Sequence, residues 1–293
     1  MTLAFTCIAD LQCRLSESPV YDERTYRLYF VDIPDRRLYA IAQPGGDLRS
    51  WTFESDVGSL GLAASGRLVV ALRDRVILFD PATETREELC SIEADIPFTR
   101  LNDGKVGPDG AFWVGSLDER PEKEPIAALY RVDPSGKVER KVEGLLVSNG
   151  LAWTADGEIM FHADSRWPWI DRWRFDRRSG EISGRTRFAT LDEATGRPDG
   201  GACDAEGFYW SAGVSAGRLN RFASDGSLVS MHEVPVPAPT MPCFGGSDFR
   251  TFYLTSLRAG RSPEALESAP QSGGLFAAKA TVAGFAPWRF LDI

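Results

Sequence analysis

The sequence predicts an all-β fold, a six-bladed β-propeller built from four-stranded blades. A small or polar turn followed by a short β-rich apolar run recurs along the 293 residues. Glycines end four of these turns, at Gly66, Gly110, Gly157 and Gly207, and the intervals between them are 44, 47 and 50 residues. No segment carries a sustained 3.6-residue apolar period with caps, so almost no helix is expected. Short strands and Asp-Gly-type turns at this period are typical of a propeller.

The apolar run after each turn is predicted to form the second strand of a blade. These runs cover residues 28–31, 68–70, 112–114, 159–161, 208–210 and 252–254. The third strands, several of which end in another turn, cover residues 38–41, 76–81, 129–134, 173–176, 219–222 and 275–278. A β-sandwich would use similar strands but gives no reason for six copies in phase. Residues 3–8 are expected to add a strand to the last blade and close the ring.

Length and composition indicate a globular protein, interpreted as one domain over residues 1–293. The chain is 43% hydrophobic and 26% charged, with 33 basic and 42 acidic residues giving a net charge of −9. This balance argues against a nucleic-acid partner, because phosphate backbones bind basic stripes. No run approaches the roughly 18 apolar residues of a membrane span, so no membrane partner is expected. Oligomeric state leaves no signal in the sequence.

Cysteine usage and the N-terminus point to a cytoplasmic location. The five cysteines are scattered, odd in number and without CxxC spacing, which favours reduced, mostly buried thiols. The first residues carry no basic region and no small-residue cleavage pattern, so no signal peptide is expected.

Polar residues recur at one position of the repeat, eight residues before the turn glycine. Asn102, Asn149 and Asp199 occupy this position in three blades, and Glu17 lies in approximately the same phase of the first blade. Each precedes an innermost strand, so a propeller would bring them together at the mouth of its channel. Asn and Asp are also common turn residues, but a shared phase favours a site over separate turns. Two carboxylates and an amide oxygen suit a divalent ion.

Other side chains are expected on the same face. Arg100 alternates onto the face of Asn102, where both can donate hydrogen bonds to a polyhydroxylated ligand, the alternative being a surface Arg and a turn Asn. The loops between second and third strands at 115–127, 165–169 and 256–273 share this face, and two are longer than a hairpin needs. Trp167 and Trp169 can stack on a sugar ring or only pack their loop.

Residues inside strands receive structural interpretations. His162 is expected to be a hydrogen-bonded core histidine, not a metal ligand or base. Trp113, Trp153 and Trp210 recur in the apolar repeat and are expected to pack between blades.

Four motifs follow one another along almost the whole chain, from near residue 10 to near residue 257. They are Ser16-Glu17-Ser18-Pro19 with Tyr29-Phe30-Val31-Asp32, Arg100-Leu101-Asn102-Asp103-Gly104-Lys105, Ser148-Asn149-Gly150-Leu151 and Arg197-Pro198-Asp199-Gly200. In this order they resemble the motifs of the gluconolactonase/regucalcin (senescence marker protein) family. Pro242-Cys243-Phe244-Gly245-Gly246 also resembles bacterial sugar-acid lactonases of that family.

The resemblance implies a propeller that holds one divalent cation and hydrolyses a sugar lactone, such as a glucono-, xylono- or arabinono-lactone, to the aldonic acid. It implies Glu17, Asn149 and Asp199 as metal ligands, and Asp199 also as the general acid/base. The ion stays open among Ca²⁺, Zn²⁺, Mg²⁺, Mn²⁺ and Fe²⁺.

The resemblance also implies Arg100 and Asn102 as substrate contacts. The resemblance further implies a substrate-binding acid in the loop Asp118-Glu119-Arg120, where family members can place one. In this sequence either Glu119 or the non-acidic Arg120 takes that position. Ser16 stands where the family often has glycine, which can alter how the backbone approaches the metal.

Three alternative functions follow from the same fold. Propellers resembling diisopropylfluorophosphatase and paraoxonase cleave phosphoester or aryl-ester bonds, but their sites tend to include a histidine near the ion. This chain has two histidines, and neither is in the phase of the polar residues. A calcium-binding regulatory protein without catalysis and a plain interaction propeller are the others.

Overall fold

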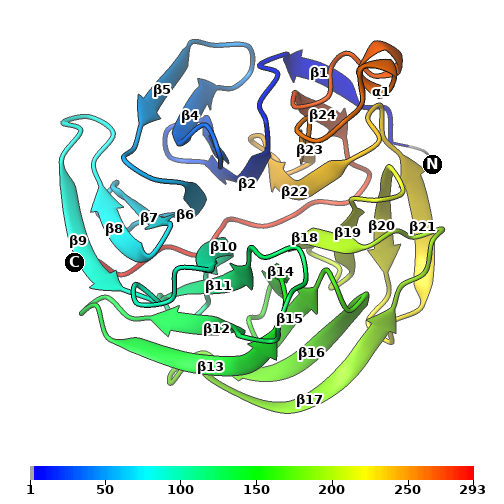
Figure 1. Cartoon of the computed structure of the whole chain (residues 1–293). Helices are drawn as coiled ribbons and strands as arrows, with labels where there is room; N and C mark the ends of the chain where they lie inside the picture. Colours follow the sequence, from blue (N-terminus) through cyan, green and yellow to red (C-terminus); the bar gives the residue numbers. More distant parts are fainter. Residues whose placement is uncertain (1–2) are drawn as a thin grey trace.

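The computed structural model describes residues 3–293 and contains six sheets, each of four antiparallel strands. The sheets are arranged as blades around a central channel (Figure 1). This arrangement confirms the predicted fold class. In residues 3–293, no helix has the length and apolar character needed to cross a bilayer.

Each blade runs from an innermost strand beside the channel to an outer strand at the rim. The innermost strands are β2 (Ser16–Asp22), β6 (Val57–Leu62), β10 (Thr99–Val106), β14 (Ser148–Trp153), β18 (Pro198–Cys203) and β22 (Pro239–Gly245). The second strands are β3 (Arg27–Asp32), β7 (Leu68–Leu72), β11 (Phe112–Asp118), β15 (Ile159–Asp164), β19 (Tyr209–Gly213) and β23 (Thr251–Ser256). The third strands are β4 (Arg37–Ala42), β8 (Arg75–Phe79), β12 (Ala127–Val132), β16 (Trp169–Asp176), β20 (Arg218–Phe222) and β24 (Leu275–Lys279). The outer strands are β5 (Leu48–Thr52), β9 (Arg86–Ser91), β13 (Val138–Leu145), β17 (Glu181–Thr190), β21 (Leu228–Glu233) and β1 (Thr6–Ala9).

The last blade takes its outer strand from the beginning of the chain. Strand β1 pairs antiparallel with β24, with Thr6 opposite Ala277 and Cys7 opposite Phe276. The predicted closing strand is confirmed, although it spans residues 6–9 and not 3–8. Because the first strand of the chain completes the blade that contains the last strand, the ring is closed by strand pairing.

Most predicted strand boundaries shift by one to three residues, and two shift by four. Strand β11 extends to Asp118, so the loop before β12 is residues 119–126 and shorter than predicted. Strand β16 begins at Trp169, four residues before the predicted start, because Trp169 already pairs with Thr190 of β17. The single helix among residues 3–293, α1 (Pro263–Ser268), lies in the long loop before β24 and buries none of its residues.

The apolar core is divided among the interfaces between neighbouring blades. Trp113 is fully buried between the third and fourth blades, with its ring centroid 6.0 Å from that of Trp153 and 5.5 Å from that of Phe175. Trp210 packs on Phe252 of the next blade, with centroids 4.7 Å apart. The predicted packing role of these tryptophans is confirmed. Each such burial stabilises the fold by about 1.5–3 kcal/mol.

Every innermost strand shifts its register near its first residues. The shifts fall between Glu17 and Val20, between Asn149 and Ala152, and at the matching places of β6, β10, β18 and β22. Such bulges bend a strand and re-aim its side chains. In β14 the bulge contains Gly150 at φ +67°, where an added Cβ would lie 2.9 Å from the Ala163 Cβ. The backbone at the start of each innermost strand is therefore bulged, whereas the rest of the strand pairs regularly with its neighbour.

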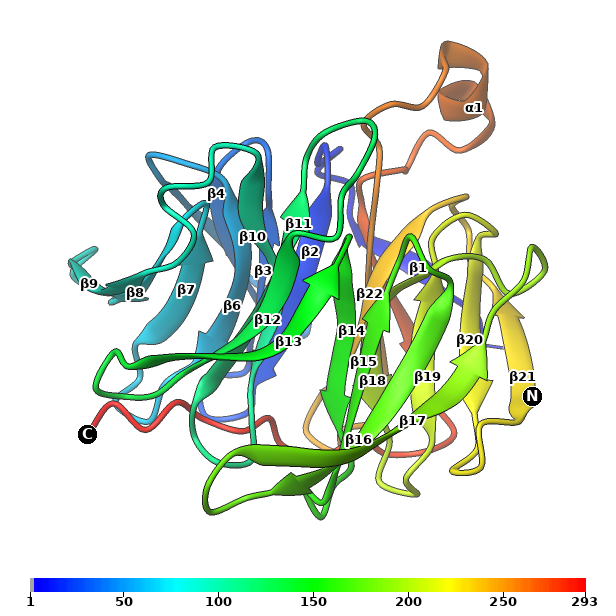
Figure 2. The ribbon, with the colours of Figure 1, turned by 60° about the horizontal axis from the view of Figure 1, so that its bottom comes forward.

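The C-terminal strap, residues 283–292, crosses the face opposite the segments that enter the innermost strands (Figures 1 and 2). Phe290 is fully buried and bridges Ala63, and the Leu291 N–H donates to the Gly110 carbonyl at 3.1 Å. Arg289 Nη2 lies 2.6 Å from Asp22 Oδ1. The strap therefore covers the far end of the central channel.

Candidate active site

The polar residues that share a phase in the sequence meet at the open end of the channel. Asn102 Nδ2 donates to Asn149 Oδ1 at 3.1 Å and to the Ser148 carbonyl at 2.9 Å. Asn149 Nδ2 in turn donates to Ser165 Oγ at 2.7 Å. The third and fourth blades thus place two buried side-chain amides in direct contact. The three hydrogen bonds fix the orientation of both amides.

Two carboxylates lie beside these amides. Glu17 is 7% exposed, and its Oε2 accepts a hydrogen bond from the Ser18 N–H at 3.0 Å. Burial, followed by the charges of Asp199 and Asp103, raises the pKa of Glu17 well above its usual range. Burial, followed by the Asp103 carboxylate, raises the pKa of Asp199 to about 8. Carboxylates from the first and fifth blades are therefore close enough to repel one another.

A third carboxylate, Asp103, was not singled out by the sequence analysis. Its Oδ2 accepts the Leu151 N–H at 3.0 Å, while its buried Oδ1 has no hydrogen-bond partner among residues 3–293. Burial raises the pKa of Asp103, and the nearby Lys105 opposes this rise. In the sequence, Asp103-Gly104 has the form of a turn pair, so only its position in the second motif, Arg100–Lys105, could have drawn attention to it.

The donor set fits a divalent cation. Within residues 3–293 no group of three or more His, Cys, Asp and Glu side chains is arranged as a metal site. The set at the channel mouth differs, because it combines the carboxylates of Glu17 and Asp199 with an amide oxygen from Asn149. Burial disfavours the ionised forms of Glu17 and Asp199, whose pKa values are raised, and the nearby Asp103 has a buried oxygen without a partner. A bound cation would relieve that cost. Hard oxygen donors of this kind suit Ca²⁺ and similar ions.

Arginines border the site on the side of the second and third blades. Arg100 Nη1 donates to Asn102 Oδ1 at 3.0 Å, so the two predicted contact residues are adjacent. Arg100 Nε lies 3.7 Å from Glu119 Oε1. Arg73 bonds the other oxygen of Glu119 and lies 3.4 Å from Asp56. Two arginines and two acids thus form a charge-balanced group.

Glu119 and Arg120 have different surroundings. Arg120 Nη2 lies 2.9 Å from Asp118 Oδ2, and its guanidinium stands 5.0 Å from the Phe98 ring centroid. Glu119 instead contacts Arg100, which belongs to the site. Of these two residues, Glu119 is therefore the one that contacts a predicted site residue.

The aromatic and histidine side chains take different places. Trp169 is buried, with Arg187 over its ring at 4.6 Å, whereas Trp167 is 42% exposed. Only Trp167 is therefore free to meet a ligand. His162 Nε2 shares a hydrogen bond with Ser148 Oγ at 2.8 Å, and burial lowers the pKa of His162 to about 4. It is a hydrogen-bonded core residue, as predicted.

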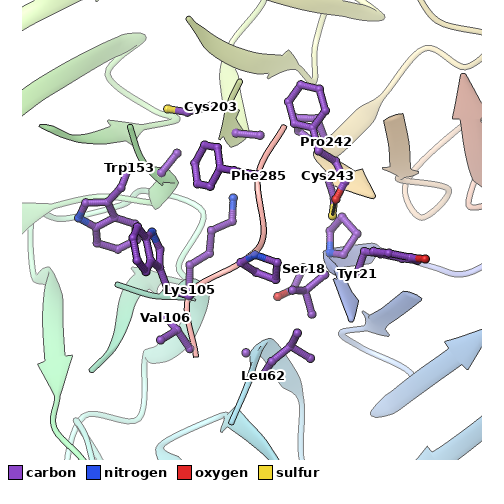
Figure 3. A pocket seen from close by; sticks show the side chains of 18 of the residues that line it. Ser18, Tyr21, Leu62, Lys105, Val106, Trp153, Cys203, Pro242, Cys243 and Phe285 are labelled. Atoms are coloured by element: carbon purple, nitrogen blue, oxygen red, sulfur yellow. Dashed lines mark hydrogen bonds between the residues drawn. The ribbon is translucent and has the colours of Figure 1, made fainter. Parts of the chain in front are cut away.

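A cavity of about 110 Å³ lies deeper in the channel, between the site and the C-terminal strap. Its walls are later residues of the innermost strands together with the strap, including Ser18, Cys203, Cys243 and Phe285 (Figure 3). None of the predicted site residues lines it. Lys105 extends into this cavity, and its ammonium group donates to the Gly201 carbonyl.

The chain is similar to known proteins over almost its whole length. The family model described as the SMP-30/Gluconolactonase/LRE-like region matches residues 15–258. The chain belongs to this family. The match covers all four motifs and every strand that contributes to the site.

Relatives of the SMP-30/gluconolactonase family match over nearly their full length. A 6-deoxy-6-sulfogluconolactonase of Pseudomonas putida is 34% identical over 287 residues, covering 98% of both chains. Human regucalcin is 30% identical over 295 residues, covering 99% of both chains. The solved structure of a calcium-binding regucalcin from Agrobacterium tumefaciens has a TM-score of 0.94 and 26% identity, covering 98% of this chain and 97% of the other.

Proposed function

We propose that the protein is a metal-dependent lactonase that hydrolyses a sugar lactone to its aldonic acid. The observation that supports this most is the convergence of Glu17, Asn149 and Asp199 at the open mouth of the channel in a family that includes sugar lactonases. The far end of the channel lies behind the C-terminal strap, so substrate would enter at this mouth.

Asp199 is proposed as the general acid/base. It is partly exposed, and no hydrogen bond from residues 3–293 reaches its carboxylate, so its oxygens are free to accept a proton. Asp199 takes a proton from the attacking water as the new C–O bond forms at the lactone carbonyl. It then returns the proton to the ring oxygen as the ring C–O bond breaks, which yields the hydroxy acid.

Arg100, Asn102 and Glu119 are proposed to orient the sugar. Arg100 is fixed between Asn102 and Glu119, so its donors are held in place before substrate arrives. Preorganised donors lower the reorganisation needed in the transition state. Glu119 can accept hydrogen bonds from sugar hydroxyls.

Glu17, Asn149 and Asp199 would hold the cation. The two carboxylates among them, Glu17 and Asp199, would balance the charge of a divalent ion. When bound, a divalent ion would polarise the lactone carbonyl as a Lewis acid.

The test compares Asp199→Asn with wild type on glucono-, xylono- and arabinono-lactone, following acid release. We expect turnover to fall about 10²–10⁴-fold, the usual contribution of a general acid/base, without a loss of folding. Asp225→Asn, a change of equal charge in an exposed turn between β20 and β21, should leave turnover unchanged. Most of the lactonase activity surviving in Asp199→Asn would refute the assigned role.

The second candidate is calcium binding without catalysis, favoured by the likeness to a solved regucalcin described as calcium-binding. Metal-stripped protein, reloaded in turn with Ca²⁺, Zn²⁺, Mg²⁺, Mn²⁺ or Fe²⁺, separates the two. Ion binding with no acid release from any lactone would favour the regulatory function.

A further inference from the structure

Two basic side chains stand on neighbouring loops at the open end of the channel. Lys123 lies in the loop between β11 and β12, which also carries Glu119. Arg166 lies in the loop between β15 and β16, directly after Ser165. Lys123 is half-buried, whereas Arg166 is exposed.

Hydrogen bonds hold both loops against one linker, residues 146–147. The Asp118 N–H donates to the first carbonyl of this linker and the Ser165 N–H donates to the second, each at 3.1 Å. Lys123 Nζ in turn donates to the carbonyl of Asp118. In agreement with this placement, burial lowers the pKa of Lys123, and the charge of Arg166 is the next cause. The ammonium and guanidinium groups are therefore near enough to repel each other.

The acids of the two loops already have other partners. Asp118 and Glu124 lie 2.9 Å and 3.2 Å from the Arg120 guanidinium. Glu119 belongs to the charge-balanced group at the border of the site. Asp164 is buried and accepts backbone N–H groups. Across residues 3–293, no carboxylate lies within ion-pair distance of either basic group, so a bound anion would relieve their repulsion.

The two basic groups border the residues proposed to hold the sugar. Ser165 Oγ accepts from Asn149 Nδ2 at 2.7 Å, so Arg166 follows a residue bonded to a proposed metal ligand. Lys123 shares its loop with Glu119, a proposed sugar contact. Loops between second and third strands lie further from the channel axis than the starts of the innermost strands (Figure 1). A lactone whose carbonyl lies at the ligands near the axis would therefore direct its other end toward these loops.

We propose that Lys123 and Arg166 form an anion subsite that selects lactones with a phosphate, sulfonate or carboxylate group at the end of the sugar away from the lactone carbonyl. The guanidinium offers paired N–H donors that match two oxygens of such a group, and the ammonium adds a point charge. This proposal rests on the proposed lactonase function and names its substrate class.

The test compares kcat/KM of the full-length protein, with the divalent ion that supports turnover, on gluconolactone and on three anionic lactones. These are 6-phosphogluconolactone, 6-deoxy-6-sulfogluconolactone and glucarolactone, which carry a phosphate, a sulfonate and a carboxylate at the same end. We expect wild type to prefer at least one of them to gluconolactone. In Lys123→Gln and in Arg166→Gln, the ratio of the anionic to the neutral kcat/KM should fall about tenfold, the effect of losing one charged hydrogen bond.

Two matched variants control for the substitution itself. Lys123→Arg keeps the positive charge and should keep most of the preference for the anionic lactone. Arg178→Gln removes an equal charge at an exposed turn between β16 and β17 and should leave the ratio unchanged.

Binding of the product acids gives a second readout that needs no turnover. Calorimetric titration of wild type should show tighter binding of 6-phosphogluconate, 6-deoxy-6-sulfogluconate or glucarate than of gluconate. The difference should shrink about tenfold in Arg166→Gln.

The outcomes separate this proposal from the function on which it rests. If wild type hydrolyses gluconolactone at least as well as all three anionic lactones, or if the ratio is the same in wild type, Lys123→Gln and Arg166→Gln, the subsite is overturned and the lactonase function stands. If no lactone is hydrolysed, the proposed function fails and calorimetry decides the subsite alone. Binding of all three anionic acids no tighter than that of gluconate then overturns it.

Discussion

Ser165 shows how one hydroxyl group can orient a site that it does not enter. Its Oγ accepts from Asn149 Nδ2 at 2.7 Å and donates to the Pro198 carbonyl at 2.5 Å, next to Asp199. The first bond fixes which end of the Asn149 amide faces Asn102. The second ties the loop after β15 to the innermost strand of the next blade. Two proposed metal ligands therefore depend on one side chain.

Replacing Ser165 with alanine should lower the affinity for a divalent ion about 10- to 100-fold, the usual effect of losing a group that orients a ligand. Calorimetric titration with Ca²⁺ measures this, and circular dichroism checks the fold. Ser165→Thr retains the hydroxyl and should restore most of the affinity. Ser268→Ala, in the exposed helix α1, is the matched control. Equal Ca²⁺ affinity in Ser165→Ala and wild type would contradict the orienting role.

Individual residues differ in how far the sequence reveals them. Asn149 could be found because it repeats a phase relative to a turn glycine. Ser165, Asp103 and Lys105 could not, because their places depend on bulges and on contacts between blades. A bulge changes which residues face the channel, and periodicity counted along the sequence does not register it.

Aspartates at the ends of second strands organise the segments around the site. Asp32, at the end of β3, accepts the Arg14 and Leu15 N–H groups ahead of Glu17 at 3.0 and 3.1 Å. Asp118, at the end of β11, instead holds its own loop, accepting the Glu124 N–H at 2.7 Å and bonding Arg120. The loop that carries Glu119 is therefore fixed at its base.

Asp118 should make stability depend on pH in acid. Hydrogen bonds from Arg120 lower the pKa of Asp118 to about 2, below its ordinary value in an unfolded chain. Its contribution is therefore complete above about pH 4 and is lost as pH falls through the folded-state value. We expect wild type to be more stable than Asp118→Asn at pH 5, with the difference shrinking toward pH 2.

Urea unfolding at several pH values measures this difference, and comparing the two proteins cancels the titration of other acids. A constant difference from pH 5 to pH 2 would show that Asp118 contributes through packing and not through its charge.

At this scale the strands were predictable, but some of their ends were not. Turn glycines and apolar runs mark the second strands because both features are local. The start of β16 depends on Trp169 meeting Thr190 across the blade, and no local pattern announces that pairing. The extension of β11 to Asp118 likewise depends on pairing with Thr99 of β10.

In the whole molecule, the central channel is open at the end that carries the proposed site and covered by the C-terminal strap at the other end. The C-terminal strap contributes Phe285 and Trp288 to the cavity wall and buries Phe290 completely. Behind it, Cys203 and Cys243 face the cavity. The six blades could be predicted from their repeat, but the strap could not, because it belongs to no repeat. The single domain over residues 1–293 stays a prediction.

Deleting residues 285–293 should expose the cavity and destabilise the fold. Burial of Phe290 alone is worth about 1.5–3 kcal/mol, so we expect a clearly lower Tm. The thiols of Cys203 and Cys243 should react faster with a thiol reagent, measured peptide by peptide by mass spectrometry. Arg289→Ala, which keeps the apolar strap but loses the contacts to Asp22 and Glu23, should have a smaller effect. Unchanged thiol reactivity after the deletion would show that the strap does not seal the channel.

Closure of the ring also has a consequence for the order of folding. Asp22 and Arg289 are 267 residues apart in sequence, and β1 pairs with the strand nearest the other end of the chain. Contacts between such distant segments form late, because loop closure must come first. During synthesis the early blades can assemble while the last one still lacks partners and its strand edges stay open to other chains. A polypeptide released before its final residues is therefore the form most exposed to aggregation.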